Sequence, residues 1–336
     1  MQSGVLVIDK PVGPSSFDVV RRVRWAASRR AGVAVRRIKA GHGGTLDPMA
    51  SGVLPICLGE GTKLAPYLLD ADKAYEAEIQ FGATTDTFDA TGAVLETHPL
   101  GEHLEGRVRL ALAAFVGESE QLPPMYSALK HKGKPLYAYA RAGQVVERRP
   151  RKVHIFSLVP LSFGDVGKGR VRVAVRCSKG TYVRSLAADL GERVGTGAHL
   201  AGLRRTASGP FALSQAVTLA EVLAESASEW PLVSPAVALA HLPAITPCPE
   251  LATALRQGRL LPAEALGLSP ETGGQLRILR ADGALLAIAE ASEGLVRPAR
   301  VFHLDSEGAL TAPSASKSRI PEVDFGPPLV GKFNPV

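Results

Sequence analysis

Alternation between apolar and polar residues indicates the strands of this chain, and apolar residues at helical spacing indicate its helices. Residues 73–81 and 170–177 alternate, which predicts two strands with one buried face each. Residues 4–9 contain a short apolar run, which predicts a buried strand. Apolar residues recur at helical spacing in 16–28, directly after serines that can cap a helix. Further helices are predicted at 107–115, 184–190, 219–225 and 251–260.

The pattern changes in the last third of the chain. Residues 243–249 carry three prolines and are typical of a linker. After this linker, Asp282 and Gly283 form a typical hairpin turn between two short apolar runs. The predicted strands of this region are 275–279, 285–289 and 301–304.

The domain organisation follows from length and pattern. A chain of 336 residues is long for one domain and suits two. We expect a main domain over about residues 1–245 and a small β-rich module over 250–310. Residues 312–336 are rich in Pro, Ser and Lys, and we expect a disordered tail there.

One segment of the main domain, about 123–152, has an unusual composition. It is polar and basic, and tyrosines alternate in it with lysines. Because it has too few aliphatic residues for a core of its own, we expect an excursion from the main body that contacts a partner. The residues that carry this pattern are Tyr126, Lys130, Lys132, Lys134, Tyr137 and Tyr139.

The charge distribution indicates a polyanionic partner. The net charge is +7, with 39 Lys and Arg against 32 Asp and Glu. Between Asp18 and Asp47 there is no acidic residue, and eight basic ones lie in that stretch. A second basic cluster follows in the tyrosine-containing segment and consists of Arg148, Arg149, Arg151 and Lys152. Two unbalanced clusters in one chain favour contacts with phosphates.

Several classes of protein are excluded by the sequence. No apolar run approaches the roughly 20 residues of a membrane span, and the first residues do not resemble a signal peptide, so we expect a cytoplasmic protein. Three widely spaced cysteines make a disulfide framework or a zinc site improbable. No phosphate-binding loop, nucleophile elbow or metal-ligand histidine pair is present. We therefore expect no metal and no cofactor.

Asp47 is the candidate for chemistry. It follows Gly41, Gly43 and Gly44, and glycines let a backbone approach a ligand closely. A carboxylate in such a loop can face a cleft. On spacing alone, however, Asp47 is better explained as a structural aspartate in a turn before Pro48.

Five stretches of the chain match, in order, the motifs of one enzyme family. The run around Asp47, from Gly41 to Pro55, looks like the central motif of the TruB family of pseudouridine synthases. Tyr75 lies in a stretch that resembles the family's tyrosine motif, and Arg184 in one that resembles its arginine motif. The five stretches are 7–16, 41–55, 73–87, 178–186 and 203–206. A single motif would be weak, whereas the ordered set is highly specific.

The resemblance implies an α+β pseudouridine synthase fold. Its central sheet is expected to be mixed and largely antiparallel, with 123–152 as a thumb-like insertion and the last module similar to a PUA domain that binds RNA. The reaction moves uracil from an N-glycosidic to a C-glycosidic bond on the same ribose. Because this is an isomerisation, it needs no redox cofactor and no metal.

The resemblance also implies catalytic roles. Asp47 is the catalytic carboxylate, and three roles stay open for it: attack on the sugar, attack on the base, or removal of a sugar proton. Tyr75 stacks on the uracil after the base leaves its helix. Arg184 holds the carboxylate with its planar fork.

Other residues are expected to bind the RNA or to support the pocket. His42 occupies the place of the extruded nucleotide or packs as a structural histidine. Lys10, Tyr182 and Leu203 line or support the pocket. The residues expected to contact the T-arm of tRNA are Lys130, Arg148, Arg149, Arg151 and Lys152.

Three functions compete. The first is a stand-alone, monomeric enzyme that modifies uridine 55 in the T-loop of tRNA and needs no protein partner. The second is a guide-RNA-dependent pseudouridylase subunit, and the third is a non-catalytic tRNA chaperone. By resemblance, the insertion 123–152 favours the first over the second, and the set of Asp47, Tyr75 and Arg184 favours catalysis over binding alone.

Overall fold

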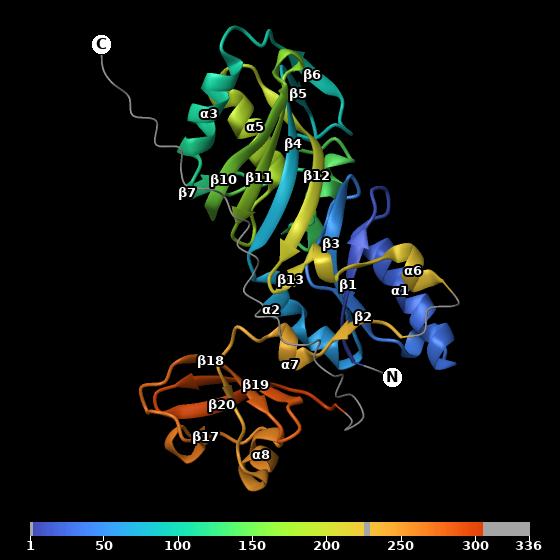
Figure 1. Ribbon diagram of the computed structural model, residues 1–336, viewed down its shortest axis with the longest axis vertical. Helices are drawn as coiled ribbons and strands as arrows, with labels where there is room; N and C mark the ends of the chain where they lie inside the picture. The colour runs from blue at the N-terminus through green and yellow to red at the C-terminus, as the bar shows by residue number, and fades with distance from the viewer. Residues whose placement is uncertain (1–2, 225–228, 305–336) are drawn as a thin grey trace.

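The computed structural model describes residues 3–224 and 229–304, and Figure 1 shows this part of the chain in colour from blue to orange. Its strands form one large sheet, a five-stranded sheet and two two-stranded sheets. The large sheet has the order β14–β1–β3–β12–β4–β11–β10–β7, and β2, β13 and β15 pair beside this path. Its strands are β1 (Gly4–Lys10), β2 (Ala40–His42), β3 (Ala50–Leu58), β4 (Lys73–Phe81), β7 (Gly117–Gln121), β10 (Arg151–Asp165), β11 (Arg170–Cys177), β12 (Ala198–Ser208), β13 (Phe211–Ala212), β14 (Val217–Thr218) and β15 (Leu232–Val233).

The large sheet is mixed and largely antiparallel, as the resemblance implied. β12 runs parallel to β3 and antiparallel to β4, so Leu203 pairs with Ala50 on one side and Ala77 on the other. β1 runs parallel to β14 and antiparallel to β3. The strands expected from the sequence at the positions of β1, β4 and β11 are confirmed. The α+β fold class is therefore confirmed.

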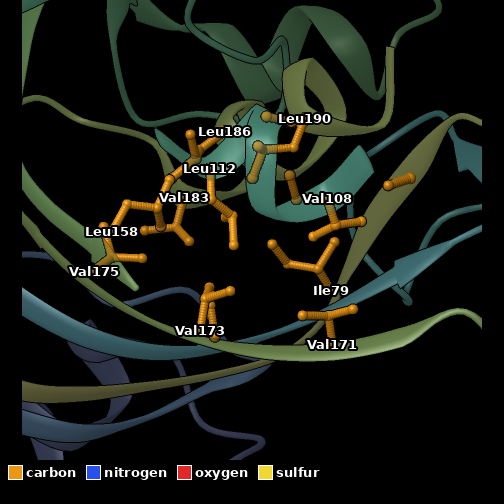
Figure 2. Packing of buried hydrophobic residues seen from close by; sticks show 14 of the residues in the cluster. Ile79, Val108, Leu112, Leu158, Val171, Val173, Val175, Val183, Leu186 and Leu190 are labelled. Atoms are coloured by element: carbon orange, nitrogen blue, oxygen red, sulfur yellow. The ribbon is translucent and has the colours of Figure 1, made fainter. Parts of the chain in front are cut away.

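Two helices cover one face of this sheet. α3 (Leu104–Ala114) and α5 (Val183–Val194) pack against β4, β10, β11 and β12. Figure 2 shows Ile79, Val171 and Val173 of the strands facing the leucines of the two helices. The apolar residues of the alternating pattern thus form the strand side of the core between the sheet and the two helices. α5 carries Arg184 in its first turn, so this layer fixes the position of that residue.

A second helical layer covers β1 and β3. α1 (Ser16–Ala31) begins with a capping box, in which Asp18 N donates to Ser15 Oγ and Ser15 N donates to an Asp18 carboxylate oxygen, each at 3.1 Å. α1 and α6 (Leu219–Leu223) bury the side chains of Leu6 and Ile8. The alternate β1 residues, such as Val7, join a different core. β1 is therefore apolar from Val5 to Ile8, because both of its faces are buried there.

The five-stranded sheet forms the β-rich module, drawn in orange in Figure 1. Its order is β16–β18–β19–β20–β17. The elements are β16 (Ala244–Ile245), α8 (Pro249–Arg256), β17 (Leu261–Pro262), β18 (Gly274–Leu279), β19 (Leu285–Ser292) and β20 (Leu295–Val301). The hairpin between β18 and β19 turns at Gly283, whose φ is 80°.

Two expectations for this region are wrong in detail. The last strand was expected at 301–304 but is β20, which ends at Val301 and contains Pro298. The expected linker 243–249 contains β16, which pairs with β18, so the second sheet begins at Ala244. The rest of the expected module beyond Leu304, and the expected tail 312–336, lie outside the described residues.

The module packs directly on the main domain. Leu285, Ile288 and Phe302 share one core with Val5 and Val7 of β1. Polar contacts reinforce this junction at Lys63, whose Nζ donates to Val301 O at 2.7 Å and lies 2.6 Å from Glu60 Oε2. The remaining short helices and strands are α2 (Ala65–Leu69), α4 (Leu136–Ala140), α7 (Pro235–Ala238), β5 (Ala83–Thr85), β6 (Val94–Thr97), β8 (Lys130–His131) and β9 (Lys134–Pro135).

Between β7 and β10 the chain makes an excursion from the large sheet, and Arg151 and Lys152 of the expected insertion 123–152 already belong to β10. β7 and β10 are antiparallel neighbours, with Gln121 opposite Arg151, so the chain leaves the sheet after β7 and returns beside it. The excursion carries β8, β9 and α4. No helix within the described residues is long and apolar enough to cross a membrane.

Candidate active site

The loop that carries Asp47 connects β2 with β3 and is anchored by Arg205. Arg205 is 1% exposed, and its guanidinium donates to three backbone carbonyls. Nε donates to Val53 O at 2.7 Å, Nη1 to Thr45 O at 3.2 Å and Nη2 to Gly44 O at 3.1 Å. Because a planar guanidinium holds its donors in a fixed fork, these bonds fix both the loop and the start of β3.

Gly52 permits this close approach of β12 to β3. Its φ is +103°, and a Cβ at this position would lie 2.2 Å from the backbone O of Arg205. Only glycine fits such a contact without moving a strand. The glycine in the motif therefore serves the packing of two strands beneath the loop that carries Asp47.

The other side of the loop is fixed by the start of α1. Leu46 N donates to Ser16 Oγ at 2.8 Å, and this hydroxyl donates to Leu46 O at 2.8 Å. The Lys10 ammonium is fully buried and donates to Pro11 O and Pro14 O, each at 2.9 Å. Burial lowers the pKa of Lys10 to about 8, against the opposing effect of the Asp47 carboxylate. Lys10 Nζ also donates to Pro48 O at 3.5 Å, so it links the Asp47 loop to the chain before α1.

Arg184 lies directly beside Asp47. Its Nε is 2.8 Å from Asp47 Oδ2. The Arg184 side chain is 5% exposed, whereas that of Asp47 is 35% exposed, so a buried cation holds an accessible carboxylate. Nη1 donates to Thr87 O at 3.2 Å and Nη2 donates to Tyr126 O at 2.8 Å. Tyr126 belongs to the excursion after β7, which therefore forms one wall of the site.

A second carboxylate, Asp89, shares Arg184. Its Oδ2 lies 3.6 Å from Arg184 Nε, and its side chain is 6% exposed. The Thr87 hydroxyl at 2.7 Å and the Thr91 backbone N–H at 3.0 Å donate to its Oδ1. These donors fix the buried carboxylate, as a charge away from water requires. Asp89 was not among the residues predicted from the sequence.

Tyr75 lies on β4 at the junction of the two main cores. It packs with Met49 and Leu203 against both of them. Burial raises the pKa of Tyr75 to about 12, and the Arg205 guanidinium acts in the opposite direction. The phenol is therefore neutral at physiological pH.

His42 and Tyr182 border the same region. His42 ends β2, and its Nδ1 is buried with no hydrogen-bond partner among the described residues. Burial, followed by the charge of Arg205, lowers the pKa of His42, so its imidazole is neutral. The Tyr182 backbone is clamped by Gln121, whose Oε1 accepts from Tyr182 N at 2.7 Å.

The structure brings most of the predicted site residues together around the loop between β2 and β3. They are Asp47, Tyr75, Arg184, His42, Lys10, Tyr182 and Leu203. The predicted basic residues lie on the excursion and at the start of β10. Lys130, Arg149, Arg151 and Lys152 are exposed. Arg148 is half-buried, and its Nη1 donates to Pro123 O at 2.9 Å, which closes the base of the excursion.

Comparison with known proteins assigns this chain to a family. The sequence model described as "TruB family pseudouridylate synthase (N terminal domain)" matches residues 30–183, and that described as "tRNA pseudouridylate synthase B C-terminal domain" matches 184–238. The chain belongs to the TruB family of pseudouridine synthases. It is a tRNA pseudouridine synthase, and hence an isomerase.

Two similar members of the TruB family are bacterial proteins named tRNA pseudouridine synthase B. That of Thiobacillus denitrificans is 47% identical over 301 residues, which cover 89% of this chain and 95% of that protein. That of Burkholderia mallei is 48% identical over 304 residues, which cover 89% and 96%.

Solved structures show the same fold in a relative. A chain of a Cbf5–Nop10–Gar1 complex superposes with a TM-score of 0.68 at 27% identity, covering 90% of this chain and 85% of that one. A chain of an H/ACA RNP bound to a substrate RNA containing 2′-deoxyuridine gives a TM-score of 0.65 at 26% identity, with the same coverage.

Two residues of this TruB-family site were missed from the sequence. Arg205 stands inside the last motif, two residues after Leu203, so the signal was present but pointed equally to Arg204. Asp89 lies in a turn-rich stretch together with Asp86, and nothing local distinguishes the two. In the structure, Asp86 Oδ1 accepts a local bond from Ala93 N at 2.8 Å, whereas Asp89 faces Arg184.

Proposed function

We propose that this enzyme converts uridine 55 in the T-loop of tRNA to pseudouridine as a stand-alone protein, with Asp47 as its catalytic carboxylate. The observation that carries the proposal is the 2.8 Å contact between Arg184 Nε and Asp47 Oδ2 in a site that Tyr75 also borders. A carboxylate held by a buried cation on one oxygen and open to solvent on its other side is ready to meet a substrate.

The chemistry requires two changes of bonding at one ribose. The bond from C1′ to N1 of the uracil breaks, a bond from C1′ to C5 forms, and a proton leaves C5 while N1 gains one. Asp47 acts at the sugar or at the base, and each of its three open roles needs an ionised oxygen. Arg184 uses one carboxylate oxygen of Asp47 and leaves the other for the reaction.

Tyr75 contributes through its ring. A base that leaves its helix loses its stacking partners, and an aromatic ring restores about 1–3 kcal/mol per base. Because the pKa of Tyr75 is raised to about 12, its hydroxyl stays protonated and adds no charge beside Asp47. Leu203 and Met49 pack against the same two cores as Tyr75.

The remaining predicted residues are assigned to binding and support. Lys130, Arg149, Arg151 and Lys152 contact phosphates of the T-arm, because they are exposed on the excursion and on the edge of β10. Arg148 braces the base of the excursion, while His42 and Tyr182 border the extruded nucleotide. Lys10 supports the loop.

We assign catalysis to the main domain and RNA contact to both domains. Residues 244–304 carry six arginines and six acidic residues, so the second module has no net charge. Long-range attraction to tRNA therefore comes from the main domain. The module contributes contacts to the tRNA through the complementarity of its surface to the RNA.

A guide-RNA-dependent function is the second candidate. Chains of a Cbf5–Nop10–Gar1 complex and of an H/ACA RNP have the same fold, which favours it. Two observations favour the stand-alone function instead. The excursion between β7 and β10 is typical of stand-alone enzymes by resemblance, and identity to proteins named tRNA pseudouridine synthase B is 47–48%, against 26–27% for the two complexes.

The test is pseudouridine formation in an unmodified tRNA transcript, without metal and without other proteins. Wild type should convert uridine 55, and Asp47→Asn should bind the transcript equally well but convert none. Asp70→Asn is a matched control, because Asp70 is a surface residue paired with Lys179 at 3.0 Å, and it should act like wild type. A wild type that binds tRNA but forms no pseudouridine would favour a partner-dependent subunit or a chaperone.

A further inference from the structure

A surface cavity of about 370 Å³ lies between α1 and α6. It is lined by Arg21, Arg22, Trp25 and Leu223. Trp25 is 46% exposed, which is unusual for so large an apolar ring. The cavity thus combines an open indole face with two guanidinium groups.

The cavity belongs to a longer stripe along α1. Phe17, Arg21, Trp25 and Arg29 follow one another at intervals of four residues, which places them on one side of the helix. Phe17 is 65% exposed, and Arg29 Cζ lies 5.1 Å from the centre of the Trp25 ring. This cation–π contact holds the indole in place before any ligand arrives.

Basic residues predominate around the cavity, where Arg21 pairs with Asp18 at 2.8 Å. No acidic residue occurs between Asp18 and Asp47. Arg24 Nε donates to Val35 O at 3.0 Å, and this bond ties the turn Val35–Arg37 to α1. Arg36 and Arg37 are both exposed on that turn. Such a surface is complementary to a polyanion.

The stripe begins beside the catalytic loop. Ser16, at the start of α1, shares two hydrogen bonds with Leu46, the neighbour of Asp47. Trp25 lies nine residues further on, which is about 13 Å along the helix axis. That span corresponds to about four nucleotides of a stacked strand. The distance between the start of α1 and Trp25 is thus one that a short stretch of an RNA strand can span.

We propose that this cavity receives the base of an unpaired nucleotide of the tRNA substrate, which stacks on Trp25 while Arg21 and Arg22 contact the adjacent phosphates. The proposal rests on the proposed function only in taking tRNA as the occupant. It adds a second base-binding site to the one beside Tyr75. Aromatic rings among arginines bind single-stranded RNA in this way, with little preference for sequence.

The test measures tRNA binding to the full chain with Trp25→Ala and Trp25→Phe. Trp25→Ala should weaken binding by about 5- to 150-fold, the equivalent of one stacked base. Trp25→Phe keeps a ring and should retain most of the affinity. Leu110→Ala is the matched control, because Leu110 is an apolar residue that is 76% exposed on α3, and it should bind like wild type.

Fluorescence gives an independent readout. The chain has two tryptophans, and Trp230 is only 7% exposed. Adding tRNA should quench the emission of wild type, and the quenching should vanish in Trp25→Phe. Absence of quenching, or unchanged affinity of Trp25→Ala, overturns the proposal and leaves the surface to phosphates or to a protein partner. Equal losses in Trp25→Ala and Trp25→Phe overturn stacking.

The two proposals fail separately. Pseudouridine formation by wild type tests the reaction and does not depend on Trp25. If wild type forms no pseudouridine but Trp25→Ala weakens tRNA binding, only the proposed function is lost. If turnover is normal and Trp25→Ala binds like wild type, only the second base site is lost.

Discussion

Arg184 holds Asp47 through a single 2.8 Å contact, from Nε of the guanidinium to Oδ2 of the carboxylate. Every nitrogen of Arg184 is engaged, because Nη1 and Nη2 donate to the carbonyls of Thr87 and Tyr126. These carbonyls belong to segments that are distant in sequence. Arg184 therefore joins the loop of Asp47, the turn after β5 and the excursion after β7.

Arg184→Lys should lower kcat on the order of 100-fold and leave the KM for tRNA within a few-fold. An ammonium is a single point charge and cannot reach Asp47 and both carbonyls together. Single-turnover pseudouridine formation measures the effect. Arg172→Lys is the matched control, since Arg172 pairs with Glu76 at 2.9 Å on the surface, and it should keep wild-type activity. Equal rates for wild type and Arg184→Lys would contradict the assigned role.

Asp89→Asn should lower kcat by about 10-fold, equivalent to ~1.4 kcal/mol in the barrier. The amide keeps the shape of the side chain but removes the negative charge 3.6 Å from Arg184 Nε, so the guanidinium is less firmly oriented. KM should be unchanged, because Asp89 is buried. Steady-state kinetics with tRNA separate the two constants, and a change in KM alone would refute a positioning role.

Arg205→Lys should destabilise the protein by about 2–4 kcal/mol, since one ammonium replaces a fork that bonds three buried carbonyls. Urea denaturation measures the loss. Below the unfolding transition, kcat should also fall, because Gly44 and Thr45 lose their anchors beside Asp47. A variant with normal stability would show that the loop holds its shape without Arg205.

Asp189→Asn should stabilise the protein at neutral pH by about 1–3 kcal/mol. Burial, with a smaller effect from Glu192, raises the pKa of Asp189 to about 6 in the folded state. The folded protein therefore binds the proton more tightly than the unfolded chain, and wild type loses stability as the pH rises from about 4 to 6.

Melting temperatures at pH 4 and pH 7.5 check this linkage. The variant should melt above wild type at pH 7.5, and the difference should shrink toward pH 4, where the wild-type carboxyl is protonated in the folded state. Glu192→Gln is the control and should give a smaller gain. A difference that does not change with pH would contradict the shifted pKa.

Local patterns in the sequence determined most of the secondary structure and the family. Alternation in 73–81 and 170–177 predicted β4 and β11, since a strand with one buried face needs that period. The ordered motifs singled out Asp47, Tyr75 and Arg184 as candidates. Local patterns failed to predict β20. This strand contains Pro298, a residue that is unusual in strands, and it lies between β19 and the short β17 in its sheet.

Only the tertiary structure decided which groups meet. Asp89 joins Arg184 across 95 positions, and Arg205 reaches Gly44 across 161. No periodicity encodes such pairs, because they depend on the register of β12 against β3 and on how α5 packs over the sheet. The sequence by itself thus determined the elements and the chemical groups. Packing between distant segments determined that a buried guanidinium holds an exposed carboxylate, and that an indole and two arginines of α1 border a cavity with α6.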